Sequence, residues 1–363
     1  MKDKDKVGMA HLTEELARRR AAALGLAGVS AASPAALVKR LGAVQAQDYR
    51  MATWSIAQRL SHRLADVEEA VATGTILRTH VMRPTWHFVA RDDLRWMQEL
   101  TAPRVLALMS HYDRRNGIDA ALVARGTKTI AAAIGRGGHL TRREIAGALS
   151  RAGIKTTPWQ AGQLLTHAEL RAIVCSGAPR GRQQTYALVD ERAPRRSALT
   201  RDEALATLAR RYFQSHGPAT ARDFQWWSGL SAADVARSID VLGRAVERVR
   251  GGDRTYLLGA KPVTRKAGSA HVIQPFDELV VAYRESRDVV DVSGAARGGS
   301  ADGATLLTRG VIYDGQIVAR WTIAPARGSR AIVLEPLRRL SSAERASVAA
   351  AASRFERFYF GAT

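Results

Sequence analysis

Cysteine is almost absent from this 363-residue chain, and Cys175 is the single example. One cysteine cannot form an internal disulfide, and it cannot supply a zinc site that needs several thiolates. No apolar run approaches the roughly 18 residues that a membrane-spanning helix needs, and none follows the basic N-terminus as it would in a secretory signal. We therefore expect a cytoplasmic, nucleoid-associated protein without a membrane partner.

Several common catalytic motifs are also missing. The sequence has no Walker-type phosphate loop, no Gly-x-Gly-x-x-Gly after a strand, no His-Glu-x-x-His and no Gly-x-Ser-x-Gly. Its nine histidines do not cluster at the spacing of metal ligands. These patterns predict that the protein uses no cofactor and no metal.

Acidic residues are scarce relative to basic ones. The chain has 55 Lys and Arg against 34 Asp and Glu, a formal net charge of +21 and a pI of about 11.0. A GC-rich genome would explain why arginine outnumbers lysine, but it does not explain the deficit of acids. A positive field attracts polyanions, and neutralising phosphates releases the counterions condensed on DNA. The charge therefore favours nucleic acid over an anionic membrane, since no amphipathic anchor stands out.

The sequence contains a helix-and-hairpin pattern that occurs three times. With 46% hydrophobic residues, the chain can bury a core, and its length allows two or three domains. The first copy has a helix start at Ser33-Pro34, where serine caps and proline takes the first helical position. Its expected helices cover 11–25, 33–44, 51–60 and 66–71, and its expected strands cover 75–82 and 85–89. Helices followed by a hairpin predict a winged helix.

Two further copies follow the first. The second has a capping box at Thr141 and Glu144, and the loop of its hairpin carries Arg180 and Arg182, as a wing in contact with DNA would. Its other elements are expected over 120–134, 158–172, 173–175 and 185–189. The third has helices over 201–215, 221–228 and 232–243, and a hairpin over 246–258. A short glycine-bearing turn between its last two helices is typical of a helix-turn-helix.

The last part of the chain differs in character. Strands are expected over 271–283, 305–313, 316–323 and 331–334, with a tight turn at Asp314-Gly315 and a final helix over 341–358. The Gly/Ser-rich segment 293–303 has two interpretations, a flexible loop or a hairpin tip that enters a DNA groove. The sequence thus predicts an α+β fold of tandem winged-helix units with a C-terminal β-rich region and a concave DNA-binding shape. The predicted boundaries are 10–110, 111–192, 198–260 and 268–363.

Two polar stretches stand out within the first copy. Segment 44–48 reads Val-Gln-Ala-Gln-Asp, and Gln45 and Gln47 point the same way if it is extended. Helix capping explains such amides as well as catalysis does. Segment 78–87 combines two arginines, two histidines, two threonines and Trp86, a set that can clamp phosphates and stack on a base. An ordinary wing with Trp86 anchored in the core is the alternative, and for Trp86 we favour it.

These stretches carry a resemblance to a known family. Together with several later motifs they resemble the winged-helix family of AlkZ- and YcaQ-like DNA glycosylases, from about residue 10 to residue 358. The later motifs are Leu94-Arg95-Trp96, Thr101-Ala102-Pro103-Arg104, Gln274-Pro275-Phe276-Asp277-Glu278, Tyr283-Arg284 and Asp314-Gly315. Gln45 and Gln47 match the Gln-apolar-Gln motif of the AlkZ branch. The YcaQ-like branch has Asp at the second polar position, so Gln47 favours the AlkZ branch. Asp48 lies one residue beyond that position.

The resemblance implies a monofunctional DNA glycosylase that acts on bulky N7-alkylguanine, and in some members one that unhooks interstrand crosslinks as antibiotic self-resistance. Its implied catalytic residues are Gln45 and Gln47. Its expected partner is double-stranded DNA containing alkylated bases, bound by a monomer. The residues expected to contact that DNA are Arg50, Arg78, His80, Arg83, His87, Arg180 and Arg182. Without the resemblance, the residues leave open a winged-helix transcriptional regulator or a non-catalytic protein that binds damaged DNA or a drug.

Overall fold

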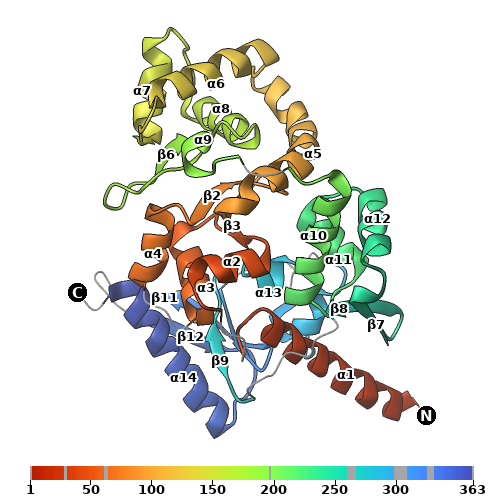
Figure 1. The fold of residues 1–363 in the computed structure, drawn as a ribbon. Coiled ribbons are helices and arrows are strands. Elements are labelled where there is room, and N and C mark those ends of the chain that lie inside the picture. Colours follow the sequence, from red (N-terminus) through yellow and green to blue (C-terminus); the bar gives the residue numbers. More distant parts are fainter. Residues whose placement is uncertain are drawn as a thin grey trace.

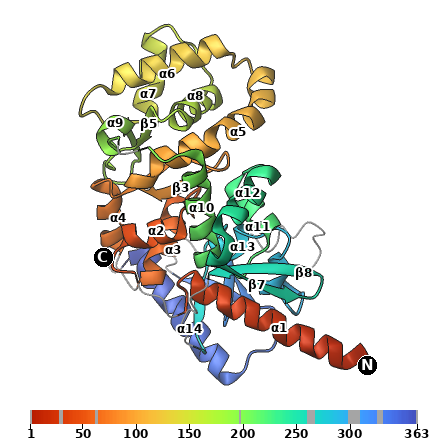
Figure 2. The same ribbon diagram turned by 45° about the vertical axis from the view of Figure 1, so that its right-hand side comes forward.

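The computed structural model describes residues 2–27, 31–60, 64–195, 198–259, 267–297, 309–324 and 331–361. Figure 1 shows an upper part that runs from α5 to α9, above a lower part that holds the two ends of the chain. The N-terminal helix α1 (Lys2–Ala23) lies along the lower part and is drawn almost separate from the rest at its first turns (Figure 2). It is anchored by Arg20, whose buried guanidinium donates to the carbonyls of Pro218 and Ser286 at 2.7 Å.

The first unit has a helix, a short strand, two helices and a hairpin. Ser33 caps its first helix and Pro34 occupies the first helical position, as the sequence predicted. Its elements are α2 (Pro34–Leu41), β1 (Val44–Gln45), α3 (Tyr49–Leu60), α4 (Leu64–Ala72), β2 (Ile76–His80) and β3 (Trp86–Ala90). The strands form an antiparallel sheet of order β1-β3-β2. Helices followed by a hairpin were predicted here, whereas the short strand β1 and its pairing with β3 were not.

The second unit repeats this order. Its elements are α6 (Ala120–Ile134), β4 (Leu140–Thr141), α7 (Arg142–Arg151), α8 (Pro158–Leu170), β5 (Val174–Ser176) and β6 (Thr185–Leu188), with sheet order β4-β6-β5. Capping boxes begin α7 at Thr141 and α8 at Thr157. Each threonine side chain accepts from the backbone N–H of the third helical residue, and the side chain of that residue accepts from the backbone N–H of the threonine. The short helix α9 (Val189–Arg192) follows.

The third unit has the same order with a reduced first strand. Its elements are α10 (Arg201–Ser215), α11 (Ala221–Ser228), α12 (Ala232–Leu242), β7 (Val246–Gly251) and β8 (Arg254–Gly259). A single bridge between Ala219 and Leu257 stands where the other units have a short strand. Gly229 between α11 and α12 has a φ of 68°, and a side chain there would meet the carbonyl of Met82, so only glycine fits this turn.

A long helix that the sequence did not predict joins the first two units. It is α5 (Leu94–Arg115), which begins after the short turn η1 (Arg91–Asp93). Pro103 lies inside it and removes one backbone donor, which is why its sequence does not read as a continuous helix. The helix packs against α10 on one side and α8 on the other.

The C-terminal part contains a four-stranded antiparallel sheet and a covering helix. Its strands are β9 (Ala270–Val272), β10 (Gly310–Tyr313), β11 (Gln316–Ile323) and β12 (Ile332–Pro336), in the order β12-β11-β10-β9. Its helices are α13 (Glu278–Val281) and α14 (Ser342–Glu356). The short helical segments η3 (Arg287–Val290), η4 (Ala295–Arg297) and η6 (Arg357–Gly361) also belong to this part, whereas η2 (Gly243–Ala245) precedes β7 in the third unit. The groove-entering segment 293–303 is described only to residue 297, so the rest of that hypothesis lies outside the described residues.

The strand expected over 271–283 is wrong beyond Val272. The chain turns at Pro275 and Phe276, where φ is 63°, and Asp277 then caps α13. Asp277 is also the partner of buried Arg59, at 2.6 Å. This charge pair fixes a turn at a place where the apolar pattern alone suggested continued extension.

The hydrophobic cores connect some units and not others. Residues 118–186 of the second unit form a cluster of their own around Leu164. A larger cluster instead combines β2 and β3 of the first unit with α5 and the helices of the third. Another joins α2 to α4 with strands of the C-terminal sheet. The predicted domain boundaries stay a prediction, because these cores show packing and not independent folding. Within the described residues, no helix has the length and apolar character to cross a membrane.

Candidate active-site cavity

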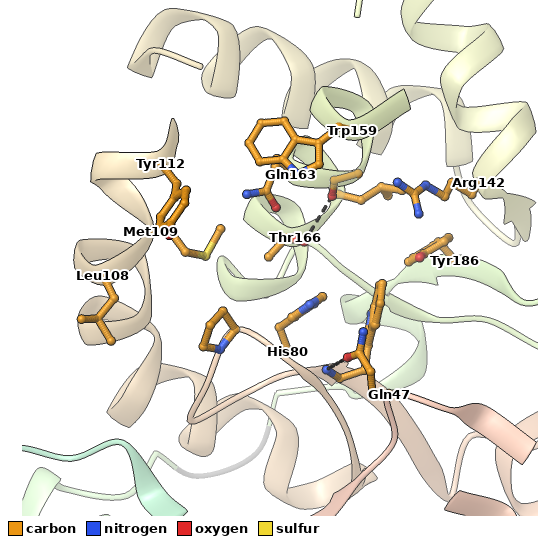
Figure 3. A pocket seen from close by; sticks show the side chains of 14 residues that line it. Gln47, His80, Leu108, Met109, Tyr112, Arg142, Trp159, Gln163, Thr166 and Tyr186 are labelled. Atoms are coloured by element: carbon orange, nitrogen blue, oxygen red, sulfur yellow. Dashed lines mark hydrogen bonds between the residues drawn. The ribbon is translucent and has the colours of Figure 1, made fainter. Parts of the chain in front are cut away.

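A cavity of about 500 Å³ lies between the first and second units, beside α5. Figure 3 shows residues of the first unit on one side of it, with α5 and α8 on the others. Its lining residues are Gln47, His80, Pro84, Trp86, Leu108, Met109, Tyr112, Arg142, Trp159, Gly162, Gln163, Leu165, Thr166 and Tyr186. Among the residues that the structure describes, the lining contains no carboxylate and no lysine, and its polar groups are amides, hydroxyls, indole N–H groups, one histidine and one arginine.

Gln47 is the predicted catalytic residue that lines this cavity. Strand β1 ends at Gln45, and the chain then leaves the sheet so that Gln47 is exposed. Its amide oxygen accepts from the backbone N–H of Trp86 at 3.4 Å. Arg78 supports the backbone behind it, because its guanidinium donates to the carbonyls of Ala46 at 2.9 Å and Gln47 at 3.3 Å. The amide is therefore held at the cavity wall by its own chain and by the neighbouring hairpin.

Gln45 is placed differently from Gln47. It is 6% exposed and does not line the cavity. Its backbone N–H donates to the buried carboxylate of Glu278 at 2.8 Å, and its carbonyl accepts from Gln274 at 3.3 Å. Its side-chain oxygen is buried without a hydrogen-bond partner among the described residues. The two amides do not share one surface, because the segment is extended only as far as Gln45.

Trp86 forms part of the cavity wall and is not a core anchor, which corrects the interpretation favoured from the sequence. It is half-buried, with the Arg78 guanidinium 4.4 Å from its ring centroid and the tilted ring of His80 at 4.7 Å. His80 in turn contacts Glu169 at 2.5 Å. Burial lowers the pKa of Arg78 from its ordinary value, and nearby anionic groups oppose that shift. The wall therefore consists of Arg78, Trp86 and His80 in mutual contact, and the buried carboxylate of Glu169 pairs with His80.

Arg83 is half-buried and His87 is fully buried, and neither lines the cavity. His87 is fully buried, and its two ring nitrogens contact the carbonyl of Thr85 at 2.9 Å and Arg83 at 3.2 Å. Since the guanidinium can only donate, the ring accepts from Arg83 and donates to Thr85. Burial, and then the charge of Arg83, hold the pKa of His87 well below its ordinary value, so the ring is neutral. Arg83 and His87 therefore contact each other and not the cavity.

Two of the remaining predicted residues line a second hollow of about 790 Å³, between the first unit and the wing of the second. Arg50 and Arg182 both line it. Arg50 is half-buried and lies 4.7 Å from the ring of Tyr359, whereas Arg182 is exposed. Arg180 is exposed too, but it forms an ion pair with Glu144 at 2.6 Å. Asp48, also in this lining, caps α3 by accepting from Met51 at 3.1 Å.

Residues that sequence reasoning missed form the far side of the first cavity. Leu108 and Tyr112 project from α5, and Trp159 projects from the first turn of α8. Their exposed fractions are 60%, 65% and 43%. The sequence did not show that these three residues lie together, because α5 was not predicted as a helix and only the packing of α5 on α8 brings them together.

Metal ligands do not gather in the described part of the chain, where no three histidine, cysteine or carboxylate side chains are grouped closely enough to hold an ion. The cavity therefore has to be understood through its amides, hydroxyls, rings and arginines.

Three helix-and-hairpin units, with a cavity between two of them, define a protein of mixed helix and sheet. A family model described as DNA glycosylase AlkZ-like matches residues 38–358, so the chain belongs to the AlkZ-like DNA glycosylase family. The predicted family is confirmed, and with it DNA as the substrate.

Among solved structures, the DNA glycosylase AlkZ of Streptomyces sahachiroi is similar to this chain. The two share 22% sequence identity with a TM-score of 0.74, over 94% of this chain and 96% of that one. At this identity the likeness shows the fold alone, and it confirms the predicted fold class. No curated protein matches the sequence.

Proposed function

We propose that this glycosylase is monofunctional and hydrolyses the N-glycosidic bond of N7-alkylguanine in double-stranded DNA, acting as a monomer. The observation that carries the proposal is the neutral amide of Gln47 at the wall of a cavity that has no carboxylate in its described lining. Such a site offers no carboxylic acid among its described lining residues, so it suits a base that leaves without protonation.

The chemistry of the substrate agrees with a site of this kind. Alkylation at N7 makes guanine cationic, so its bond to the sugar is already weak and the base departs as a neutral molecule. The enzyme then has to place a water molecule near the anomeric carbon and to tolerate an oxocarbenium-like sugar. An amide oxygen can accept from that water, although an amide is a poor base. Unmodified bases would remain, because their departure needs a proton that this site does not supply.

Gln45 and Gln47 are the residues we propose to position the water. Gln47 presents its amide at the cavity, whereas Gln45 lies two residues earlier with a buried, unpaired side-chain oxygen among the described residues. A buried acceptor without a hydrogen-bond partner costs free energy. This supports a hydrogen bond to the Gln45 oxygen that forms when DNA is bound. Glu278 holds the same segment through the N–H of Gln45.

The monofunctional assignment rests on the absence of an amine from the described lining. A lyase reaction needs an amine to form a Schiff base with the opened sugar. Lys39 is the lysine nearest in sequence to the two glutamines, and it is exposed on α2. It does not line the cavity.

The test is incubation with duplex DNA that carries N7-methylguanine at one site. We expect release of the free base in proportion to enzyme, and strand breaks only after alkali treatment. Breaks without alkali would show a lyase and contradict the monofunctional assignment. No release from any N7-alkylated duplex, combined with tight binding to a narrow consensus sequence, would favour a transcriptional regulator.

The proposal extends to bulky adducts and to interstrand crosslinks formed as part of antibiotic self-resistance. The volume of about 500 Å³ supports it, because cavities of about 300–1,000 Å³ accommodate drug-sized ligands. Cleavage of one glycosidic bond would separate two strands that are joined through two guanine N7 atoms. A duplex crosslinked by a bifunctional nitrogen mustard tests this on a denaturing gel, where persistence of the slow band after full release of N7-methylguanine would contradict it.

A further inference from the structure

Large apolar side chains are concentrated at one edge of the cavity. Leu108, Tyr112 and Trp159 are 60%, 65% and 43% exposed, and we call these three residues the aromatic rim. They belong to two helices that meet only through the tertiary fold, α5 and α8. Exposed apolar surface is costly in water, and a contiguous patch of it marks a site that binds something.

The rim faces the amide that we assign to catalysis. In Figure 3, Tyr112 and Trp159 lie on the side of the cavity opposite Gln47, with an open space between them. Trp86 is on the Gln47 side, and one face of its ring is already covered by Arg78 at 4.4 Å. A group held at Gln47 would therefore have the aromatic rim as its other boundary.

Apart from Arg142, the remaining lining on that side is neutral. Gln163 and Thr166 supply an amide and a hydroxyl from α8, and Tyr186 supplies a second hydroxyl from β6. Burial raises the pKa of Tyr186 above its ordinary value, so this hydroxyl keeps its proton. Arg142 is the charged residue at this end, and its guanidinium is partly committed to the carbonyl of Pro158 at 3.0 Å. Rings with a few neutral polar groups suit a flat aromatic ligand.

We propose that the aromatic rim binds the planar aromatic portion of a guanine N7 adduct, with Trp159 as the main specificity-determining residue. This rests on the proposed function, because it places the adducted guanine at Gln47. The base alone does not need a cavity of about 500 Å³, whereas a base joined to a polycyclic ring system does. Stacking on an aromatic side chain contributes about 1–3 kcal/mol per ring system, which is enough to distinguish such an adduct from a small one.

Trp159 can be changed without disturbing the fold. It occupies the second position of α8, after the capping residue Thr157, and it is 43% exposed. Trp159→Ala removes the ring, and Trp159→Phe retains a smaller one. Val241→Ala is the matched control, because Val241 is 51% exposed on α12 and does not line the cavity.

The experiment compares three duplexes of one sequence. One is unmodified, one carries N7-methylguanine, and one carries the N7 adduct of an acridine half-mustard, which joins a three-ring aromatic system to guanine. We expect Trp159→Ala to weaken binding of the acridine duplex by about 10-fold, the factor that corresponds to about 1.4 kcal/mol of stacking. Binding of the other two duplexes should stay within about twofold, Trp159→Phe should recover most of the loss, and Val241→Ala should change nothing.

Two results would overturn the proposal. An equal loss on all three duplexes would show that the rim contacts ordinary DNA, and no loss on any would show that it contacts neither. Because binding is measured without base release, the outcome is separate from that of the proposed function. Wild-type protein that releases N7-methylguanine but shows no Trp159-dependent preference would refute the rim alone. Protein that releases no base would refute the proposed reaction, while the acridine preference remains measurable.

Discussion

Gln47 and Gln45 differ in their surroundings, and this difference separates catalysis from stability at the scale of single residues. Gln47 is exposed and its side chain makes one long hydrogen bond, of 3.4 Å to the N–H of Trp86. Gln45 is 6% exposed and lies in a strand that Glu278 and Gln274 hold on both sides. Truncation at Gln47 therefore removes a polar group from the cavity, whereas truncation at Gln45 also leaves a void in packed surroundings.

We expect Gln47→Ala to lower the single-turnover rate of base release by about 100-fold, the usual cost of removing one positioned polar group. DNA affinity should be nearly unchanged, and the free energy of unfolding should change by less than about 0.5 kcal/mol, as for other exposed positions. Single-turnover kinetics and urea melts on the same protein check this. Gln47→Asp is the companion variant: it adds a base, and we expect it to retain activity on N7-methylguanine.

Gln45→Ala tests whether the second amide has only a structural role or also positions the water. If both amides only organise the turn, each Ala variant should lose about 1 kcal/mol of stability and activity only in proportion. A stable and fully active Gln47→Ala variant would remove that residue from the mechanism.

Arg180 and Arg182 present a contrast at the scale of one element, the hairpin formed by β5 and β6. Both were predicted to contact phosphates. Arg180 already pairs with Glu144 at 2.6 Å, and this pair lowers the pKa of Glu144 to about 2. Arg182 is exposed at the tip, and among the described residues no carboxylate is shown paired with it. A free guanidinium gains more from a phosphate than one that must first leave a carboxylate.

We therefore expect Arg182→Ala to weaken DNA binding more than Arg180→Ala does. Loss of one phosphate contact should reduce the slope of log K against log salt by about 0.9, irrespective of DNA sequence. Fluorescence anisotropy at several salt concentrations measures this slope. Equal slopes for wild type and Arg182→Ala would show that the wing tip does not touch the backbone.

The elements that the sequence predicted correctly are those with local signals. Helices α6, α10 and α11 begin at capping residues Asp119, Thr200 and Thr220, and their predicted ranges agree with the structure. Helix α5 was missed because Pro103 interrupts its pattern, although neighbouring helices hold it. The strand expected after Val272 was wrong because the Arg59–Asp277 pair fixes a turn there, and residues 218 positions apart leave no local signal.

The candidate site follows the same rule. Gln47 was identified from its motif, which is local in sequence. The aromatic rim was not, because Tyr112 and Trp159 come together only when α5 packs on α8. The placement of Arg83 and His87 away from the cavity lining was missed for a related reason, since their environment is supplied by residues distant in sequence.

At the scale of the whole molecule, three of the buried histidines lie in parts that share hydrophobic cores. His87 lies in the first unit, His216 in the third and His271 in the C-terminal sheet, with exposed fractions of 0%, 0% and 7%. Burial lowers the pKa of all three, and for His271 to about 3. Nearby arginines add to the shift, whereas the carboxylate of Glu278 opposes it at His216. Two hydrophobic cores connect these parts, so protonation in one should destabilise the others.

These shifts predict acid destabilisation well above the range in which carboxylates titrate. A histidine with a folded pKa below its unfolded value of about 6.5 binds protons more readily when unfolded, so stability falls as pH falls below about 6.5. The loss is about 1.4 kcal/mol per histidine for each pH unit, down to its folded pKa. Between pH 7.5 and 5.5 we expect the free energy of unfolding to fall by up to about 4 kcal/mol for the three together.

Urea melts at the two pH values measure this loss, and His271→Gln identifies its source. Glutamine stays uncharged at both pH values, so the variant should lose about a third of the pH dependence, whatever its effect on stability at pH 7.5. His111→Asn is the control, because His111 is exposed on α5 and its replacement should leave the pH dependence as it is. A free energy of unfolding that does not change between pH 7.5 and 5.5 would show that these rings accept protons in the folded protein. In that case the assignment of a neutral His87 ring that accepts from Arg83 would also be wrong.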